Sequence, residues 1–141
     1  MSSHIAAVRK FYNVFNTGDV SGFDDVLAED WQPLPAVPGN PGGRDGQKGT
    51  VAYLKSVLSN VRYTVEEIYE CSPDVVACRC ALKAVHSGPF LGLASSGAPF
   101  ELMTMEFHYF KDGRIACTRH LEDFFGVHQQ LLAAGAKPVA G

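Results

Sequence analysis

The sequence predicts an α+β domain in which a strongly curved antiparallel sheet packs on helices and leaves a pocket between the two layers. Apolar residues recur at helical spacing in the first part of the chain. After about residue 60 the pattern changes to runs rich in β-branched and aromatic residues. Asp112-Gly113 lies between two such runs, which is a strong signal for a two-residue hairpin turn. Helices followed by strands are typical of the α+β class.

The first helix is expected over about 3–16, because Ile5, Val8, Tyr12 and Phe15 form an apolar stripe. A short helix is expected to end near Leu27, and a third over about 46–59. Between these two, the stretch 31–43 holds four prolines and three glycines and is expected to be a long loop. Loops of this length in compact domains are often functional, so we expect a lid or a rim here.

Two strands are expected next, over 63–70 and 75–86. In the second, Arg79 and Lys83 mark the outer face, so the alternate residues from Val76 to His86 should face inward. A Gly- and Ser-rich loop over 88–97 precedes the hairpin, and an amphipathic helix is expected over 124–134. We expect one domain over 1–141, with 135–141 as a loose tail.

The hairpin turn sets a predicted register, in which Glu106 lies opposite Arg119 and Met105 opposite His120. The pocket face would then carry His120 and Glu122 over a floor of Met103, Met105, Phe107 and Tyr109, because that face is richer in apolar side chains. Glu106 and Arg119 would form an ion pair on the outer face. A bulge before His120 would invert this assignment.

Composition excludes several classes of function. Apolar residues make up 46% of the 141 residues and the net charge is −3. No basic cluster is present, which argues against a nucleic-acid partner. No apolar run is long enough to span a bilayer, and the start lacks a signal-peptide pattern, so we expect a cytoplasmic protein that is not bound to a membrane. The four cysteines show no metal-ligand spacing, so we expect no metal site, with Cys78 and Cys80 as small buried thiols.

Two stretches resemble the SnoaL-like polyketide cyclase family of the nuclear-transport-factor-2-like superfamily. The first is His86-Ser-Gly-Pro-Phe-Leu-Gly-Leu93 followed by Gly97. The second is Phe110-x-Asp-Gly-Arg-Ile115 with His120-Leu-Glu-Asp123 and Gln129-Gln-Leu131. The resemblance extends from Phe11 to Leu132 and implies a cone-shaped α+β barrel. Arg119 stands where the family usually has Trp, and His120 stands where characterised cyclases carry a catalytic Asp.

The resemblance implies an intramolecular ring closure, in which a carbon between two carbonyl groups is deprotonated and attacks an aldehyde or ketone of the same molecule. It implies no metal or organic cofactor and a small-molecule substrate, polyketide-like or another carbonyl compound. Histidine is the commonest general acid/base, so we expect His120 to be catalytic in a cyclase or isomerase. Tyr12, Trp31, His86 and Phe90 are expected to line the pocket, and Glu122 to orient the imidazole.

Two alternatives stay open at this point. The same fold also serves as a non-catalytic ligand-binding or association module, which a cavity filled by core side chains would favour. An epoxide-hydrolase-like enzyme would need Arg119 buried between carboxylates such as Asp25 and Asp123. Family members commonly dimerise through the outer sheet face, so the resemblance also implies a homodimer.

Overall fold

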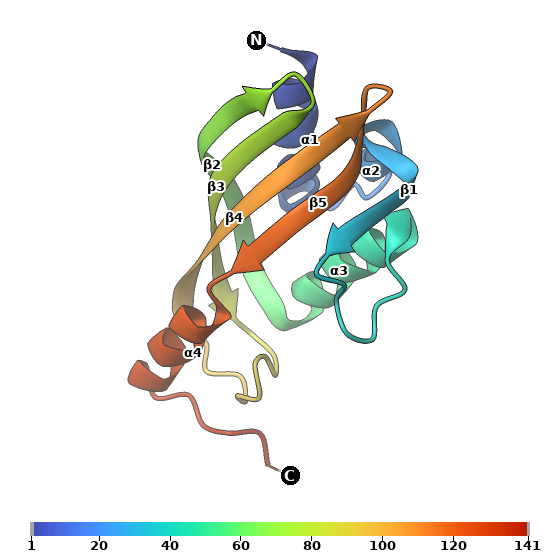
Figure 1. Cartoon of the computed structure of the whole chain (residues 1–141). Coiled ribbons are helices and arrows are strands. Elements are labelled where there is room, and N and C mark those ends of the chain that lie inside the picture. Colours follow the sequence, from blue (N-terminus) through green and yellow to red (C-terminus); the bar gives the residue numbers. More distant parts are fainter. Residues whose placement is uncertain (1, 141) are drawn as a thin grey trace.

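Five strands form one open, mixed sheet with the order β1-β5-β4-β3-β2 (Figure 1). The computed structural model describes residues 2–140. Its elements are α1 (Ser3–Thr17), α2 (Gly22–Val26), β1 (Leu27–Leu34), α3 (Gly43–Val57), β2 (Leu58–Ser72), β3 (Val75–His86), β4 (Pro99–Lys111), β5 (Arg114–Glu122) and α4 (Phe124–Ala133). The α+β class is confirmed, but the edge strands β1 and β2 do not pair, so the sheet does not close into a barrel.

Helix α1 places the first apolar stripe against the sheet. Ser2 caps its start by accepting a hydrogen bond from the Ile5 amide, and Gly18 ends it at φ 75°. Only glycine adopts this left-handed conformation without a steric penalty, so the helix stops there. Val8, Phe11, Tyr12 and Phe15 are buried, as the helical spacing predicts. Helices α1, α2 and α3 lie behind the sheet in the view of Figure 1, and α4 lies at one end of it.

Strand β1 lies where the sequence predicts the start of a loop. It runs parallel to β5, with Gln32, Pro33 and Leu34 aligned with Cys117, Thr118 and Arg119. The expected antiparallel sheet, β2 to β5, therefore carries one additional parallel strand at its edge. Proline is tolerated in a strand only at a sheet edge or a bulge, and β1 is an edge strand. Of the four prolines that indicated a loop, only Pro33 lies in β1, and the other three lie in the loop that follows the strand.

The hairpin of β4 and β5 has the predicted turn but not the predicted register. Asp112 and Gly113 both have positive φ, at 51° and 77°. Phe110 pairs with Ile115, yet Tyr109 pairs with Cys117, so Ala116 is an extra residue in β5. Beyond this bulge Glu106 lies opposite His120, and Arg119 lies opposite Phe107. The predicted Glu106–Arg119 ion pair is therefore absent.

The C-terminal segment packs against the loop 88–97 and is not loose as far as residue 139. The Ala94 amide donates to the Lys137 carbonyl, and the Val139 amide donates to the Gly92 carbonyl. Ala136 is buried. The segment thus holds this loop at the end of the molecule near α4. Over residues 2–140, no helix is long and apolar enough to cross a membrane.

Candidate active site

A cavity of about 640 Å³ lies between the inner face of the sheet and helices α1 and α3. Pro33 and residues 35–40 line it on one side, and Leu91 and Phe124 contribute at the end near α4. Most of the wall is apolar. The polar side chains in it are Asn40, Gln47, Thr50, Tyr53, Tyr63, Glu106, Thr118, His120 and Glu122. This volume is in the range of small-molecule sites, which are mostly apolar with a few placed polar groups.

His120 is held from both sides of its ring. Nδ1 lies 2.8 Å from Oε1 and 3.0 Å from Oε2 of Glu122, and Nε2 lies 2.7 Å from the carbonyl oxygen of Pro35. Carboxylate and carbonyl oxygens only accept hydrogen bonds, so both ring nitrogens donate. The hydrogen bond to Glu122 raises the pKa of His120 to about 9, the Pro35 carbonyl adds to this, and partial burial opposes it. His120 is therefore an imidazolium cation at neutral pH.

Glu106 lies directly opposite His120 on β4 and also lines the cavity. Its side chain is almost fully buried, with 6% of the residue exposed. Because burial disfavours the charged form, it raises the pKa of the Glu106 carboxyl to about 7. The carboxyl group thus exchanges a proton near neutral pH, while His120 keeps its own.

Tyr63 and Thr104 support the Glu106 side chain. The Tyr63 hydroxyl lies 2.9 Å from Thr104 Oγ1 and donates a long hydrogen bond, 3.4 Å, to Glu106 Oε1. Burial raises the pKa of Tyr63 well above its usual value, so its hydroxyl stays neutral. The hydrogen bond that Glu106 receives from Tyr63 therefore comes from a neutral donor.

A chain of buried hydrogen bonds runs behind this wall. Trp31 Nε1 donates to Thr118 Oγ1 at 3.0 Å, and Thr118 Oγ1 lies 2.9 Å from His108 Nδ1. His108 Nε2 lies 2.7 Å from the Tyr12 hydroxyl, which lies 3.0 Å from Cys78 Sγ. This chain satisfies polar groups that the core would otherwise leave unpaired, and it fixes Trp31 and Thr118 in the cavity wall.

The structure brings together only part of the expected site. Trp31, Phe90, His120 and Glu122 lie in the cavity wall. Tyr12 lies one layer behind the wall, in the hydrogen-bond chain described above. Met103, Met105 and Phe107 are exposed and Tyr109 half-buried on the opposite face of the sheet, so the expected floor is wrong. The bulge at Ala116 causes this, because it reverses the phase of β4 relative to His120.

Among the wall residues that were not expected are two ionisable ones, Tyr63 and Glu106. A signal for Glu106 was present in its own strand. Phe100, Leu102 and Phe110 share its alternation phase, whereas the opposite phase begins near Glu101 and ends at Lys111. The apolar residues at both ends of this phase therefore indicate that it is the inner face. The residues in the middle of the same face are polar because they lie at the cavity.

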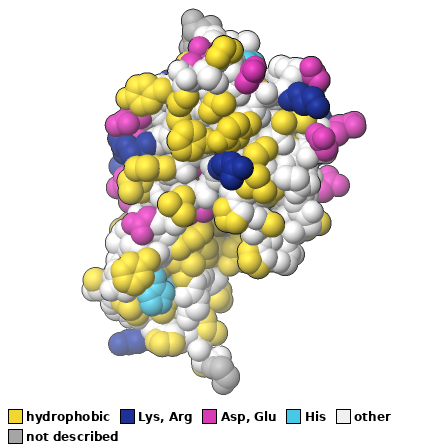
Figure 2. All heavy atoms as spheres, viewed as in Figure 1, with side chains coloured by type: hydrophobic (Ala, Val, Ile, Leu, Met, Phe, Trp, Pro, Cys, Tyr) yellow, Lys and Arg dark blue, Asp and Glu magenta, His cyan; other side chains and the backbone are white. Residues whose placement is uncertain are grey.

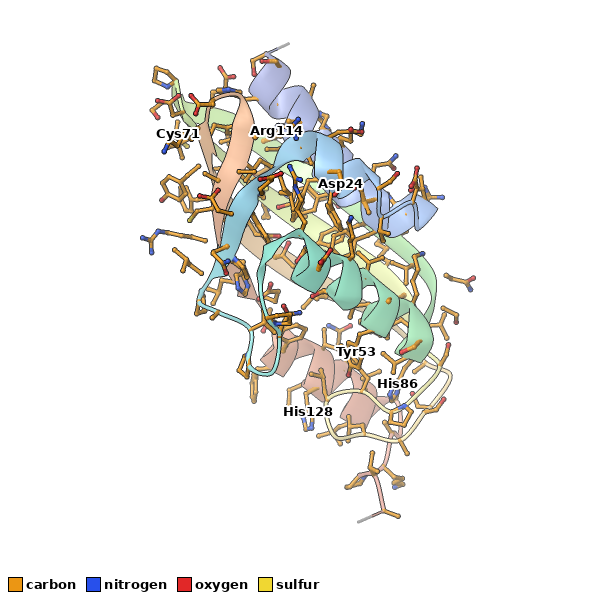
Figure 3. The ribbon with its side chains drawn as sticks, turned by 90° about the vertical axis from the view of Figure 1, so that its right-hand side faces the viewer. Asp24, Tyr53, Cys71, His86, Arg114 and His128 are labelled. Atoms are coloured by element: carbon orange, nitrogen blue, oxygen red, sulfur yellow. The ribbon has the colours of Figure 1, made fainter. Side chains whose placement is uncertain are left out.

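His86 lies at the end of β3, where Figure 3 shows it beside the loop 88–97. It is fully buried, and its Nδ1 lies 2.8 Å from Ser96 Oγ. Its Nε2 has no hydrogen-bond partner among the described residues. His86 does not line the cavity. The other inward residues of β3, including Cys78 and Cys80, are buried as predicted.

Arg119 is exposed, with its guanidinium 5.8 Å from the centre of the Tyr109 ring. Asp25 is exposed and pairs with Lys10, and Asp123 caps α4 by accepting from the Gly126 amide. The carboxylate–arginine set of the epoxide-hydrolase alternative is therefore not assembled here. Within residues 2–140, no group of three or more His, Cys, Asp or Glu side chains is arranged to hold a metal ion.

The chain matches the model of the SnoaL-like polyketide cyclase family over residues 5–131. It is 29% identical to the aklanonic acid methyl ester cyclase AcmA of Streptomyces galilaeus over 139 residues, which cover 93% of this chain and 92% of the relative. It is 26% identical to the aklanonic acid methyl ester cyclase DnrD of Streptomyces peucetius, with 93% and 92% covered.

Among solved structures, TsrD from Streptomyces laurentii superposes with a TM-score of 0.84 at 22% identity, covering 92% of this chain and 94% of that one. This likeness shows the shared fold. Because the family model matches almost the whole chain, the protein belongs to the SnoaL-like polyketide cyclase family.

Proposed function

We propose that the protein is a cofactor-independent cyclase that closes a ring within a polyketide-like carbonyl substrate by an aldol-type reaction. The observation that carries this proposal is the His120 imidazolium, held by Glu122 and the Pro35 carbonyl in the wall of a mostly apolar cavity. An apolar cavity with a few ionisable groups is what such chemistry needs, since the conjugated substrate itself stabilises most of the enolate charge.

In this proposal His120 acts as the general acid. The imidazolium donates its Nε2 proton to the carbonyl oxygen that becomes a hydroxyl during ring closure. To reach this nitrogen, the substrate oxygen takes the place of the Pro35 carbonyl oxygen, which now lies 2.7 Å from Nε2. Glu122 fixes the ring orientation and stabilises the cation through Nδ1.

The charge of the wall favours an uncharged substrate. Glu106, His120 and Glu122 are its ionisable acidic and basic groups, and none of the described wall residues is a lysine or an arginine. A free carboxylate would meet two carboxyl groups and one cation that is already paired. We therefore propose an esterified or otherwise neutral polyketide, in the manner of the methyl ester named for AcmA and DnrD.

The open cavity supports this function over a purely structural module, because a module that only associates with partners has no need of an unfilled core. For the outer face, we propose a homodimer. Leu121, Met105 and Phe107 are exposed there at 73%, 49% and 46%. Figure 2 shows apolar side chains gathered over this face of the sheet. A second copy would remove them from water.

The test is turnover of aklanonic acid methyl ester, followed by chromatography of the cyclised product. We expect wild-type protein to accelerate ring closure, and His120→Asn to lose about 10²–10⁴-fold, the usual contribution of a general acid. Aklanonic acid, the free carboxylate, should bind more weakly than its ester. Binding of the ester without any turnover would favour the non-catalytic ligand-binding alternative, and unchanged turnover in His120→Asn would exclude the role of that residue.

A further inference from the structure

The cavity wall holds two titratable groups that face each other across neighbouring strands. Glu106 and His120 are directly paired in the β4–β5 ladder, so their Cβ atoms are about 5 Å apart. Both side chains line the cavity. A substrate that accepts a proton from His120 therefore also lies within reach of Glu106.

His120 cannot itself remove a proton in the state that the structure shows. Both of its ring nitrogens donate hydrogen bonds, so the imidazolium has no free lone pair. Deprotonation of the attacking carbon needs a base from elsewhere in the wall. Two carboxyl groups are available there, Glu106 and Glu122.

Glu122 is already engaged, because both of its oxygens lie within 3.0 Å of His120 Nδ1. The Glu106 carboxyl is less occupied. Its Oε1 receives only the long hydrogen bond of 3.4 Å from Tyr63, and a hydrogen bond from Tyr12 slightly opposes the rise of its pKa. Both donors are neutral hydroxyl groups, and the residue borders the cavity. Unlike Glu122, Glu106 is therefore not paired with a cation at short range.

We propose that Glu106 is the general base of the ring closure and that it works as a pair with His120, an assignment that rests on the proposed cyclase function. Glu106 removes the proton from the carbon that lies between two carbonyl groups of the substrate. His120 donates its own proton to the oxygen of the carbonyl group that this carbon attacks. Tyr63 positions the Glu106 carboxyl.

The step balances without a co-reactant. The C–H bond breaks, its proton moves to a Glu106 carboxylate oxygen, and its electron pair becomes the enolate. The enolate carbon forms the new C–C bond with the carbonyl carbon, and the C=O π pair takes the Nε2 proton of His120. Glu106 is then a carboxylic acid and His120 is neutral, and a proton passed from one to the other through water restores both. The product is an isomer of the substrate.

The burial of Glu106 suits this role. A carboxylate in water is too weak a base to deprotonate carbon efficiently, and burial raises the pKa of Glu106 to about 7. The pKa of His120 is about 9, so this residue stays protonated near neutral pH and can act as the acid. Two groups whose environments set them to opposite tasks are typical of acid–base pairs in active sites.

The experiment separates proton removal from proton delivery. Aklanonic acid methyl ester is incubated in deuterated buffer at pH 8, and mass spectrometry follows both cyclised product and deuterium incorporated at the acidic carbon above the rate without protein. Glu106→Gln should lose both by at least about 10²-fold. His120→Asn should lose cyclisation but keep deuterium incorporation, because its base is intact. Glu101→Gln, an exposed residue of the same strand, serves as the matched control.

Glu106→Asp adds a second variant that keeps the carboxyl group. We expect it to retain deuterium incorporation at a reduced rate, which distinguishes loss of the base from loss of folding. Incorporation that persists in Glu106→Gln, or that vanishes in His120→Asn, would overturn the assignment of Glu106 while leaving the cyclase function intact. Wild-type protein that neither cyclises nor exchanges the substrate would overturn the cyclase function and this assignment together.

Discussion

Glu106 lies directly opposite His120 across β4 and β5, and both side chains border the same cavity. The pair exists because β5 carries one extra residue, Ala116, between the turn and His120. Without this bulge Glu106 would lie opposite Arg119 instead of His120. The relation between these two residues has consequences for catalysis and for stability that can be measured separately.

The first prediction is a bell-shaped dependence of cyclisation on pH. Glu106 must be ionised, which occurs above its pKa of about 7, and His120 must be protonated, which holds below its pKa of about 9. The rate should therefore peak between these values. The measurement is kcat/KM for aklanonic acid methyl ester from pH 5 to 10.5. The acidic side of the profile should move to lower pH in Glu106→Asp, because aspartate has a lower ordinary pKa than glutamate. An acidic side that stays in place would show that residue 106 does not set it.

The second prediction concerns folding. The pKa of Glu106 is raised in the folded protein, so the folded state holds this proton more tightly, and stability falls as pH rises from about 4.5 to about 7. A shift of the pKa from 4.5 to about 7 corresponds to about 3–4 kcal/mol. Glu106→Gln should thus raise the free energy of unfolding at pH 8 relative to wild type, measured by urea denaturation. At pH 3, where the carboxyl is neutral in both the folded and the unfolded state, this gain should be absent.

The third prediction concerns the charge of His120. Its raised pKa depends first on the hydrogen bond from Nδ1 to Glu122. Glu122→Gln should therefore lower the pKa of His120, and the alkaline limb of the rate profile should move to lower pH. Proton NMR titration of the imidazole checks this directly. Glu67→Gln, an exposed residue on β2 that pairs with Arg79, is the control and should leave the titration unchanged.

The fourth prediction tests the hydrogen-bond chain behind the wall. Thr118→Val removes the acceptor of Trp31 Nε1 and the partner of His108 Nδ1. Each buried polar group left unpaired costs about 1–3 kcal/mol. We expect a loss of stability of at least about 2 kcal/mol by urea denaturation. Thr64→Val, at an exposed position of β2, makes the same chemical change and should have almost no effect.

The fifth prediction concerns association. Met105 and Leu121 pair across the exposed face of the sheet. If a second copy covers this face, sedimentation should give the mass of two chains, and the double variant Met105→Lys, Leu121→Lys should give the mass of one. Val139→Lys, an exposed apolar residue in the C-terminal segment, should leave the mass unchanged. A wild-type mass of one chain would contradict the dimer.

The sequence allowed the elements with clear periodicity to be predicted. The stripe of Val8, Tyr12 and Phe15 marks α1, and the alternation from Val76 to His86 marks β3 with its inner face. Both signals are local, because each repeats within one element. The Asp-Gly turn was predictable for the same reason, since both residues favour the positive φ that the turn requires.

The site was predictable only in part, because its register depends on Ala116. An alanine gives no local signal of a bulge, and the pairing of β4 with β5 beyond it is decided by which residues the sheet buries. The apolar face of β4 that carries Met103 and Met105 was predicted to be the inner face, but it is exposed. Strand β1 was missed because Pro33 is compatible with a strand only at a sheet edge, and a sequence does not show which strand lies at an edge.

In the proposed mechanism, the carbonyl group of Pro35 competes with the substrate for His120. It occupies the very nitrogen of His120 that a substrate oxygen would use. A hydrogen bond to a charged donor contributes about 1.5–3 kcal/mol, so ligands that reach Nε2 should bind about 10–100-fold less tightly than their contacts alone would give. Small oxygen compounds that cannot displace Pro35 would be left without this contact. Selectivity for large substrates would then follow from competition between the substrate and the Pro35 carbonyl for His120, in addition to the shape of the cavity.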